Sequence, residues 1–127
     1  MLDHVSIPAR DLRQLARFYD RVLATLGLQR SKESDNAIGY GPDAKQSPCF
    51  WLLEVEGNAA TPGPGFHLSF RAKDRAQVHA FHEAALAEGA KDAGAPGPRP
   101  HYSNGFYGAF VIDPEGYKIE AVVREEV

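Results

Sequence analysis

The sequence predicts an α+β protein made of two tandem copies of one module, each with a short strand, an amphipathic helix and further strands. Three observations support this class. The chain resembles itself at an offset of 63 residues, with His67 over His4. Each copy has a helix-capping pattern followed by apolar residues at helical spacing. The remainder of each copy reads as strand segments on either side of turns that contain Gly and Pro.

The repeat is clearest between residues 4–23 and 67–86. Seven of these twenty aligned positions are identical, whereas unrelated sequences would share roughly one or two. The identical pairs are His4/His67, Ser6/Ser69, Ala9/Ala72, Asp11/Asp74, Gln14/Gln77, Phe18/Phe81 and Leu23/Leu86. We therefore expect a single domain over residues 1–127. It contains one module at about residues 1–57, a linker rich in Gly and Pro at residues 57–65, and a second module at about residues 66–125.

Each copy begins with a short strand that leads into a helix. Asp11 and Asp74 are each followed three residues later by Gln, which is the pattern of a capping box. Gly27 and Gly89 stand where a left-handed cap would end each helix, so we expect about four turns in each copy. The apolar residues at helical spacing are Leu15, Phe18, Val22 and Leu26 in one copy and Val78, Phe81, Ala85 and Leu86 in the other.

Strands account for most of the rest of each copy. In the first copy we expect them at residues 36–40 and 48–56, on either side of a turn. In the second copy, residues 107–112 and 117–124 flank Asp-Pro-Glu-Gly, which is a strong turn signal. Residues 90–93 are a candidate for one more short strand. The segment 94–105 is rich in Gly and Pro and is predicted to be a loop, serving either ligand contact or simple connection.

Composition and charge exclude several functional classes. The net charge of −3 provides no basic excess for nucleic acid or an anionic membrane surface. No apolar run is long enough to cross a membrane, and the N-terminus has no secretory pattern, so we expect a cytoplasmic protein. The single cysteine, Cys49, excludes an intrachain disulfide and a zinc site with several cysteines.

Strand alternation places two histidines and one glutamate on matching faces. His4 shares a face with Ser6, His67 shares one with Ser69, and Glu120 likewise lies opposite an apolar face. A lone strand histidine is more often structural, but the duplication puts His4 and His67 at equivalent points of two related units. Pseudo-twofold packing would bring both imidazoles to the axis. With Glu120 they would make a facial triad for one Fe, Mn, Ni, Co or Zn ion, and ligand type alone does not choose among these metals.

Glu54 is a candidate fourth metal ligand. Residues 50–55 align with residues 116–121 at an offset of 66, which places Glu54 over Glu120. The three additional residues of this offset would be absorbed in the turn. The alternative is a solvated carboxylate at the end of a strand.

These residues also give the chain its resemblance to the vicinal oxygen chelate superfamily, which groups glyoxalase I, bleomycin-resistance proteins and extradiol dioxygenases. The resemblance covers nearly the whole chain. It implies two βαβββ modules whose mixed sheets curl into a cup with the helices outside, and a metal held by His4, His67 and Glu120. In glyoxalase I a further carboxylate lies near the end of the first module, where Glu54 is the candidate. The motifs are Leu2-Asp3-His4-Val5, Phe18-Tyr19-x-x-Val22-Leu23-x-x-Leu26-Gly27, His67-Leu68-Ser69-Phe70 and Asp113-Pro114-Glu115-Gly116-Tyr117-Lys118-Ile119-Glu120.

One signature within the superfamily bears on catalysis. The extradiol dioxygenase signature has a histidine at the distance from the Asp-Pro-x-Gly turn at which His101 stands, so His101 is the candidate acid–base residue. Ala109 occupies the signature's aliphatic position, and Phe110 replaces its tyrosine. Because the tyrosine hydroxyl is lost, this sequence does not match an authentic catechol-cleaving enzyme.

Four residues are candidates for substrate binding. Arg99 could bind a carboxylate or a phosphate, with solvation at the surface as the alternative. Tyr102 and Tyr107 could each supply a replacement hydroxyl, and the alternative for both is packing. Trp51 would serve as an apolar wall of the cup.

The remaining histidines and the cysteine are assigned structural positions. His79 and His82 lie three residues apart on the second predicted helix, where no carboxylate stands at a convincing ligand spacing. We expect both to lie on the surface or to pack the helix. Cys49 has no evident activating partner and is expected to be a small strand residue.

Two functions are compatible with these residues. In the first, a metal-dependent enzyme binds two oxygens of a small substrate and stabilises an enolate-like anion, in lyase, isomerase or dioxygenase chemistry. In the second, a protein of the bleomycin-resistance type sequesters an aromatic or drug-like molecule without chemistry. The retained ligand set favours the enzyme. We also expect a homodimer, because pairing covers exposed sheet edges; whether one chain or two form the cup stays open.

Overall fold

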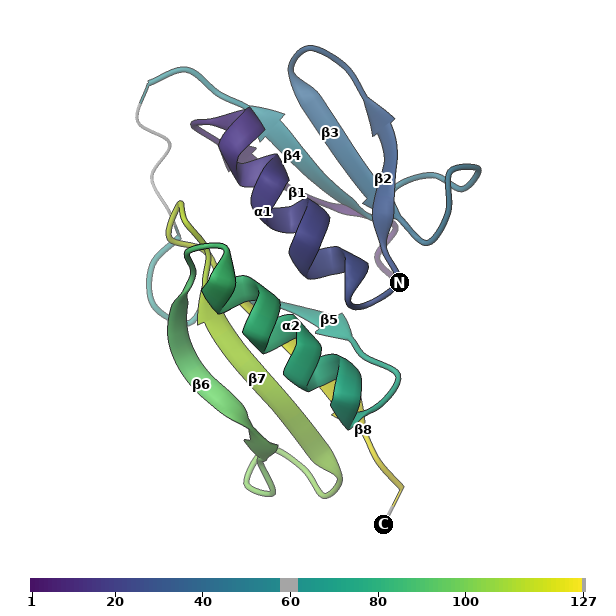
Figure 1. The fold of residues 1–127 in the computed structure, drawn as a ribbon, viewed down its shortest axis with the longest axis vertical. Coiled ribbons are helices and arrows are strands. Elements are labelled where there is room, and N and C mark those ends of the chain that lie inside the picture. Colours follow the sequence, from purple (N-terminus) through teal and green to yellow (C-terminus); the bar gives the residue numbers. More distant parts are fainter. Residues whose placement is uncertain (58–61, 127) are drawn as a thin grey trace. The chain divides into compact units, whose positions relative to one another are not determined.

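The computed structural model describes residues 1–57 and 62–126. Contacts divide the chain into two compact units, Met1–Ala60 (unit 1) and Thr61–Val127 (unit 2). Each unit is one helix lying against one four-stranded sheet (Figure 1). Part of the predicted linker, residues 58–61, lies outside the described residues. Among those that are described, no helix is both long enough and apolar enough to span a membrane.

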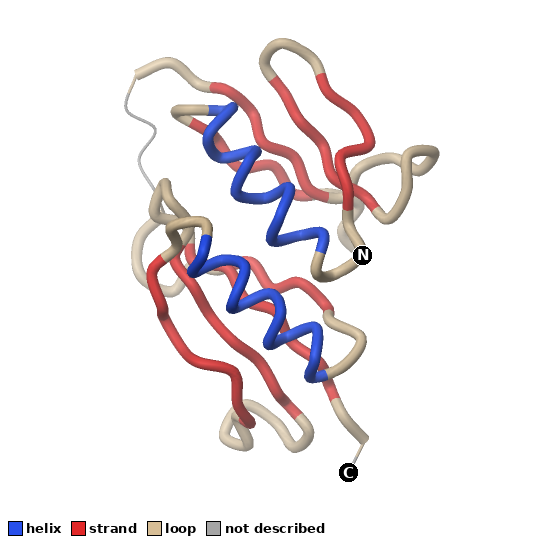
Figure 2. The backbone as a smooth tube through the Cα atoms, in the orientation of Figure 1, coloured by secondary structure: helices blue, strands red, loops and turns tan. Residues whose placement is uncertain are grey.

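The two units have the same topology. In each sheet the strand that precedes the helix pairs in parallel with the last strand, and the other neighbours are antiparallel. Figure 2 distinguishes the helices, strands and loops of both units. The predicted α+β class with two βαβββ modules is therefore confirmed. Unit 1 contains β1 (Val5–Ala9), α1 (Leu12–Ala24), β2 (Gln29–Glu33), β3 (Ala37–Gly41) and β4 (Phe50–Glu54), in the sheet order β1-β4-β3-β2. Unit 2 contains β5 (Leu68–Arg71), α2 (Arg75–Ala87), β6 (Lys91–Pro98), β7 (Phe106–Ile112) and β8 (Lys118–Arg124), in the order β5-β8-β7-β6.

Both helices begin and end as their sequences predict. The carboxylate of Asp11 accepts a hydrogen bond from the backbone N–H of Gln14 at 3.1 Å, and Asp74 accepts one from Gln77 at 2.8 Å. These bonds satisfy donors that a helix N-terminus otherwise leaves free. At the other end, Gly27 and Gly89 have φ angles of 82° and 99°, the left-handed conformation that favours glycine.

Two strands differ from the prediction. β2 was not expected, because its sequence Gln-Arg-Ser-Lys-Glu is polar throughout; it forms an edge strand that pairs only with β3. β6 runs to Pro98 and so occupies the first part of the segment predicted to be a loop, residues 94–105. Its proline residues are compatible with a strand because β6 lies at the sheet edge, where a missing N–H donor is tolerated. The register of β6 with β7 shifts twice around its glycines.

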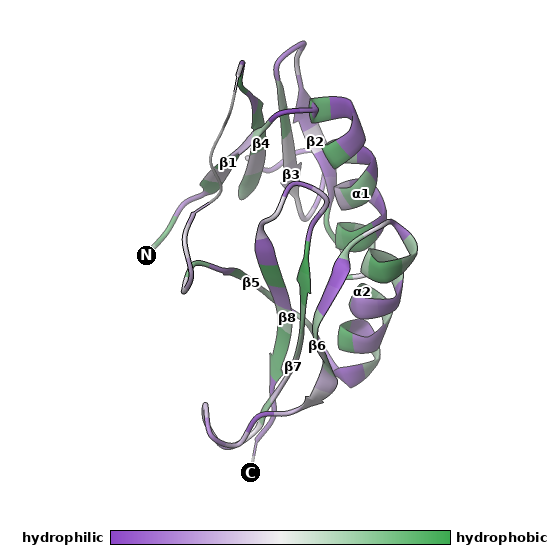
Figure 3. Cartoon of the chain, turned by 90° about the vertical axis from the view of Figure 1, so that its left-hand side faces the viewer, coloured by the Kyte–Doolittle hydropathy of each residue, from purple (hydrophilic) through white to green (hydrophobic). Residues whose placement is uncertain are grey.

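In each unit the core lies between the helix and one face of the sheet. In unit 1, Tyr19 of α1 packs between Phe18 and Phe50, with ring centroids 4.9 and 5.0 Å apart. In unit 2, Phe81 of α2 is fully buried, as is Ile119 of β8. Both helices carry apolar as well as polar residues along their length (Figure 3). Since successive strand residues point to opposite faces, the even-numbered residues of β8 lie on the face away from α2.

We expect a matched pair of glycine substitutions to show how tightly the turn before β7 is built. Gly27 and Gly105 both have a φ of +82°, so alanine at either position costs about 1–2 kcal/mol of backbone strain. A Cβ at Gly27 would meet nothing within 4 Å, whereas one at Gly105 would collide with the backbone carbonyl of Glu125. In urea unfolding, Gly105→Ala should therefore lose roughly 2 kcal/mol more than Gly27→Ala. Equal losses would contradict this account of the turn.

Candidate functional site

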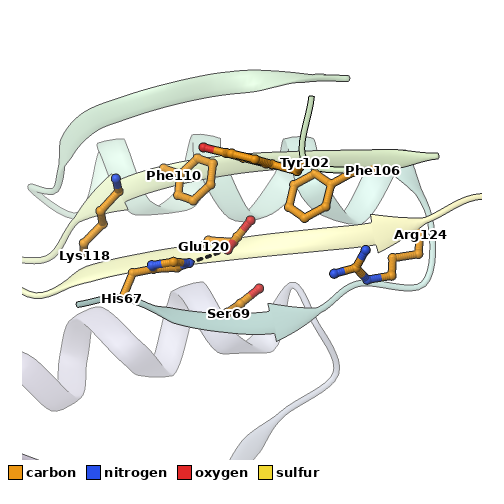
Figure 4. Close-up of a pocket in the computed structure, with 8 residues that line it drawn as sticks. All are labelled: His67, Ser69, Tyr102, Phe106, Phe110, Lys118, Glu120 and Arg124. Carbon is orange, nitrogen blue, oxygen red and sulfur yellow. Dashed lines mark ion pairs between the residues drawn. The ribbon is translucent and has the colours of Figure 1, made fainter. Parts of the chain in front are cut away.

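A pocket of about 330 Å³ opens on the face of unit 2 that points away from α2 (Figure 4). β5, β7 and β8 supply most of its walls, and the turn between β6 and β7 supplies Tyr102. Its position follows from strand alternation, because Tyr107 and Ile119, one residue away from lining residues, belong to the buried core. The lining residues are His67, Ser69, Tyr102, Phe106, Phe110, Lys118, Glu120 and Arg124.

Strand register brings His67 and Glu120 together at the centre of this pocket. Ser69 on β5 pairs with Glu120 on β8, and His67 lies on the same side of the chain as Ser69, two residues earlier. His67 Nε2 is 3.2 Å from Glu120 Oε1. Phe110 pairs with Glu120 from the other side, on β7. The carboxylate thus lies between Ser69 on one neighbouring strand and Phe110 on the other.

The Glu120 carboxylate is buried and only partly satisfied. Glu120 is 2% exposed, and its Oε2 has no hydrogen-bond partner among the described residues. Burial raises the pKa of the Glu120 carboxyl, while the hydrogen bond with Ser69 and the charge of His67 counteract this in part. A buried carboxylate oxygen without a partner is costly unless a cation or a water meets it. The donor chemistry therefore fits a divalent cation, which imidazole nitrogen and carboxylate oxygen both bind well.

The third predicted ligand, His4, belongs to unit 1. It immediately precedes β1, as His67 immediately precedes β5, so the two histidines occupy equivalent places in the two modules. His4 Nδ1 lies 2.7 Å from Asp3 Oδ2, and its side chain is half exposed. Taking each unit by itself, the described residues contain no group of three His, Cys, Asp or Glu side chains placed to hold a metal. Unit 2 alone brings together two of the three predicted ligands.

The register of unit 1 does not place Glu54 at the position equivalent to Glu120. Ser6 pairs with Trp51 as Ser69 pairs with Glu120, so Trp51 holds the equivalent place. Glu54 is exposed, pairs with Ala9 and lies an odd number of residues further along β4, on the opposite face. The sequence alignment of Glu54 with Glu120 fails because the connections between the last two strands differ in length in the two copies. A tryptophan therefore stands where the second copy has its carboxylate.

Of the expected acid–base and substrate-binding residues in unit 2, only Tyr102 lines the pocket. Its side chain is 57% exposed at the rim. His101 is exposed and contacts the Tyr102 ring at a centroid distance of 4.3 Å, but it is not part of the lining. Arg99 donates hydrogen bonds to the carbonyl oxygens of Ala95 and Gly97 at 2.8 and 2.9 Å, so it braces its own turn.

Tyr107 lies on the other face of β7, against α2. Its hydroxyl is 2.6 Å from His79 Nε2, and the Arg75 guanidinium lies 4.3 Å from the centre of its ring. Tyr107 therefore does not supply a hydroxyl to the pocket, because its side chain points to the opposite face of β7. Phe106 points into the pocket, so its neighbour must point away.

His79 and His82 pack the helix, as expected. His82 is buried and lies 3.0 Å from Asp92 Oδ1 on β6, which lowers the pKa of the Asp92 carboxyl. This contact ties α2 to the edge strand of its sheet. Cys49 is exposed and lies one residue before β4, so it is not a strand residue.

Sequence reasoning did not assign Lys118, Arg124, Phe106 or Phe110 to the pocket wall. The sequence could have identified Lys118 and Arg124, because both lie an even number of residues from Glu120 on the last strand and therefore share its face. Lys118 Nζ lies 4.9 Å from the centre of the Phe110 ring, and Arg124 Cζ lies 5.2 Å from that of Phe106. Two cations and two aromatic rings thus surround the His67–Glu120 pair.

Comparison with known proteins supports the same architecture. Residues 1–121 match the family model of the Glyoxalase/Bleomycin resistance protein/Dioxygenase superfamily. A glyoxalase/bleomycin resistance protein from Albidiferax ferrireducens is 34% identical, with a TM-score of 0.84 over 98% of this chain and 99% of that one. A family enzyme from Burkholderia phytofirmans shares the fold at 24% identity, with a TM-score of 0.74 over 97% and 98% of the two chains. A protein named "Probable lactoylglutathione lyase" from Synechocystis is 28% identical over 94% of this chain and 92% of its own length.

The placement of Tyr107 leads to a prediction about stability. Tyr107→Phe removes the hydrogen bond to His79 and should lower the free energy of unfolding by about 1 kcal/mol. Ligand binding in the pocket should be unchanged, because the hydroxyl faces α2. Tyr102→Phe is the matched control, since its hydroxyl is at the exposed rim and its loss should leave stability unaltered. Weakened ligand binding by Tyr107→Phe with native stability would contradict the assignment.

Proposed function

Because the chain belongs to the Glyoxalase/Bleomycin resistance protein/Dioxygenase superfamily, we propose that it is a metal-dependent enzyme acting on a small substrate that chelates the metal through two oxygens. The observation that carries the proposal is the His67–Glu120 pair, in which a buried carboxylate oxygen has no partner among the described residues. A small substrate is consistent with the pocket volume of about 330 Å³.

In this proposal His4, His67 and Glu120 hold one divalent ion, which is Fe, Mn, Ni, Co or Zn. A bound cation of this kind supplies Lewis acidity that polarises a substrate carbonyl and favours an enolate-like anion. Glu120 is the one anionic member of the set. Its carboxylate is buried, lies opposite Ser69 in the strand register and is 3.2 Å from His67 Nε2, so its position is set before any ligand arrives.

In this proposal the aromatic residues of the pocket shield the His67–Glu120 pair from water. Phe106 and Phe110 are buried on β7 and face Glu120, so they exclude water from one side of the pair. Phe110 also occupies the place at which the extradiol signature has its tyrosine. Because phenylalanine carries no hydroxyl, this wall cannot donate a hydrogen bond to a bound oxygen.

The proposed reaction is a lyase, isomerase or dioxygenase reaction other than glyoxalase I chemistry and extradiol ring cleavage. Glyoxalase I chemistry calls for a fourth carboxylate, and β4 presents Trp51 rather than Glu54 at the position equivalent to Glu120. Extradiol cleavage calls for an acid–base histidine, and His101 is exposed at a turn and is not among the residues that line the pocket. Neither set of requirements is met by the residues on the pocket wall.

A second candidate function is sequestration of an aromatic molecule without chemistry. Three of the eight lining residues are aromatic, and Tyr102 is 57% exposed at the rim, where a ligand ring could cover it. This reading needs no metal. Metal binding therefore separates the two functions.

We further propose that the protein is a cytoplasmic homodimer. Each sheet has an outer strand on both sides, β1 and β2 in unit 1 and β5 and β6 in unit 2. Exposed strand edges favour pairing with another chain.

The metal assignment predicts a difference between two carboxylate variants. Glu120→Gln removes the anionic ligand and should lower Zn²⁺ or Co²⁺ affinity by about tenfold or more in isothermal titration calorimetry. Glu54→Gln is the matched control and should bind metal like the parent protein. Full stoichiometry with unchanged affinity in Glu120→Gln would refute the assignment.

The subclass argument predicts weak or no activity on two standard substrates. Protein loaded separately with Fe²⁺, Ni²⁺ and Zn²⁺ would be assayed on methylglyoxal with glutathione and on catechol. Turnover should stay well below about 1 per second, a rate at the lower end of ordinary enzymes. A higher rate on either substrate would overturn the exclusion and identify the subclass.

A further inference from the structure

The pocket of unit 2 carries more positive charge than its histidine–glutamate pair requires. Lys118 and Arg124 lie on the same face of β8 as Glu120, two residues before it and four residues after it. Side chains two residues apart on a strand are separated by roughly 6–7 Å, so the cations flank the carboxylate (Figure 4). Neither forms an ion pair within the described part of the chain. The pocket thus offers two cations against one carboxylate.

Arg124 is held in place with most of its donors unused. One of its terminal nitrogens donates to Ser103 Oγ at 2.9 Å, and its guanidinium lies 5.2 Å from the centre of the Phe106 ring. Figure 4 shows the guanidinium turned back along β8 toward Glu120. A guanidinium has five N–H donors in a planar fork, which matches the two oxygens of a carboxylate. Arg124 is therefore positioned to bind an anionic group inside the pocket.

The space between the two cations is bordered by aromatic rings. The Tyr102 ring stands edge-on to those of Phe106 and Phe110, at centroid distances of 5.1 and 6.4 Å. Lys118 Nζ lies 4.9 Å from the Phe110 centroid at the opposite end from Arg124. A volume of about 330 Å³ is at the lower end for ligand pockets and suits a molecule with one ring.

We propose that this pocket binds a small planar organic anion, an aromatic carboxylate whose ring lies against Phe106 and Phe110 and whose carboxylate pairs with Arg124. This inference rests on the proposed function, because it directs the ring's other oxygen substituents to the His67–Glu120 pair. Arg124 then determines specificity, since its exposed guanidinium can form a charge-assisted pair with a carboxylate that an uncharged analogue cannot form. Lys118 adds a favourable field for the anion without a direct contact.

The test compares two probes that differ by one carboxylate, catechol and 3,4-dihydroxybenzoate. Their affinities would be measured by isothermal titration calorimetry, first with a chelator present and then with saturating Zn²⁺. We expect 3,4-dihydroxybenzoate to bind at least about tenfold more tightly in both states, the size of effect usual for a hydrogen-bonded charge pair. Arg124→Met should abolish this preference, and Arg124→Lys should restore part of it. Arg13→Met, which removes an exposed charge from α1, should leave it unchanged.

The outcomes separate this inference from the proposed function. Equal affinity for the two probes in the parent protein would overturn the inference without any variant being needed. A preference that survives in Arg124→Met, with a native circular dichroism spectrum, would also overturn it. A preference that depends on Arg124 in the presence of the chelator supports the inference even if Zn²⁺ fails to bind. Failure of Zn²⁺ to bind would contradict the proposed metal-dependent enzyme but not the anion site.

Discussion

The site depends on the parallel pairing of β5 with β8. This pairing sets Ser69 opposite Glu120, and the two-residue period of the strand then places His67 beside the carboxylate. A slip of one residue would turn Glu120 to the face that packs on α2, where Ile119 and Ala121 are fully buried. Because the core cannot accept the Glu120 carboxylate in place of Ile119 or Ala121, burial of the apolar face of β8 determines which residues lie on its polar face. The geometry of the site is thus a consequence of core packing.

Duplication explains both the likeness and the difference between the two units. The same strand order, capping aspartates and preceding histidines occur in each. Yet at the place of Glu120 unit 1 has Trp51, so unit 1 has no counterpart of the His67–Glu120 pair at that position. The two copies have thus diverged at this position, which holds a carboxylate in unit 2 and an indole ring in unit 1.

The sequence predicted those features that depend on local pattern. Capping at Asp11 and Asp74 and alternation around Glu120 are set by neighbouring residues, and both were found as expected. The position of Glu54 was predicted incorrectly because strand register depends on turn length, which one sequence does not determine. β6 was missed in part because its glycines and prolines resemble a loop, and only its place at the sheet edge makes them compatible with a strand.

The central claim is that His67 and Glu120 are ligands of a divalent metal. The most direct measurement is anomalous X-ray diffraction from crystals grown with excess Co²⁺ or Zn²⁺. The account predicts an anomalous peak within about 2.0–2.2 Å of His67 Nε2 and of a Glu120 carboxylate oxygen. Crystals that hold the metal elsewhere, or that show no peak beside His67 and Glu120 at saturating metal, would contradict it.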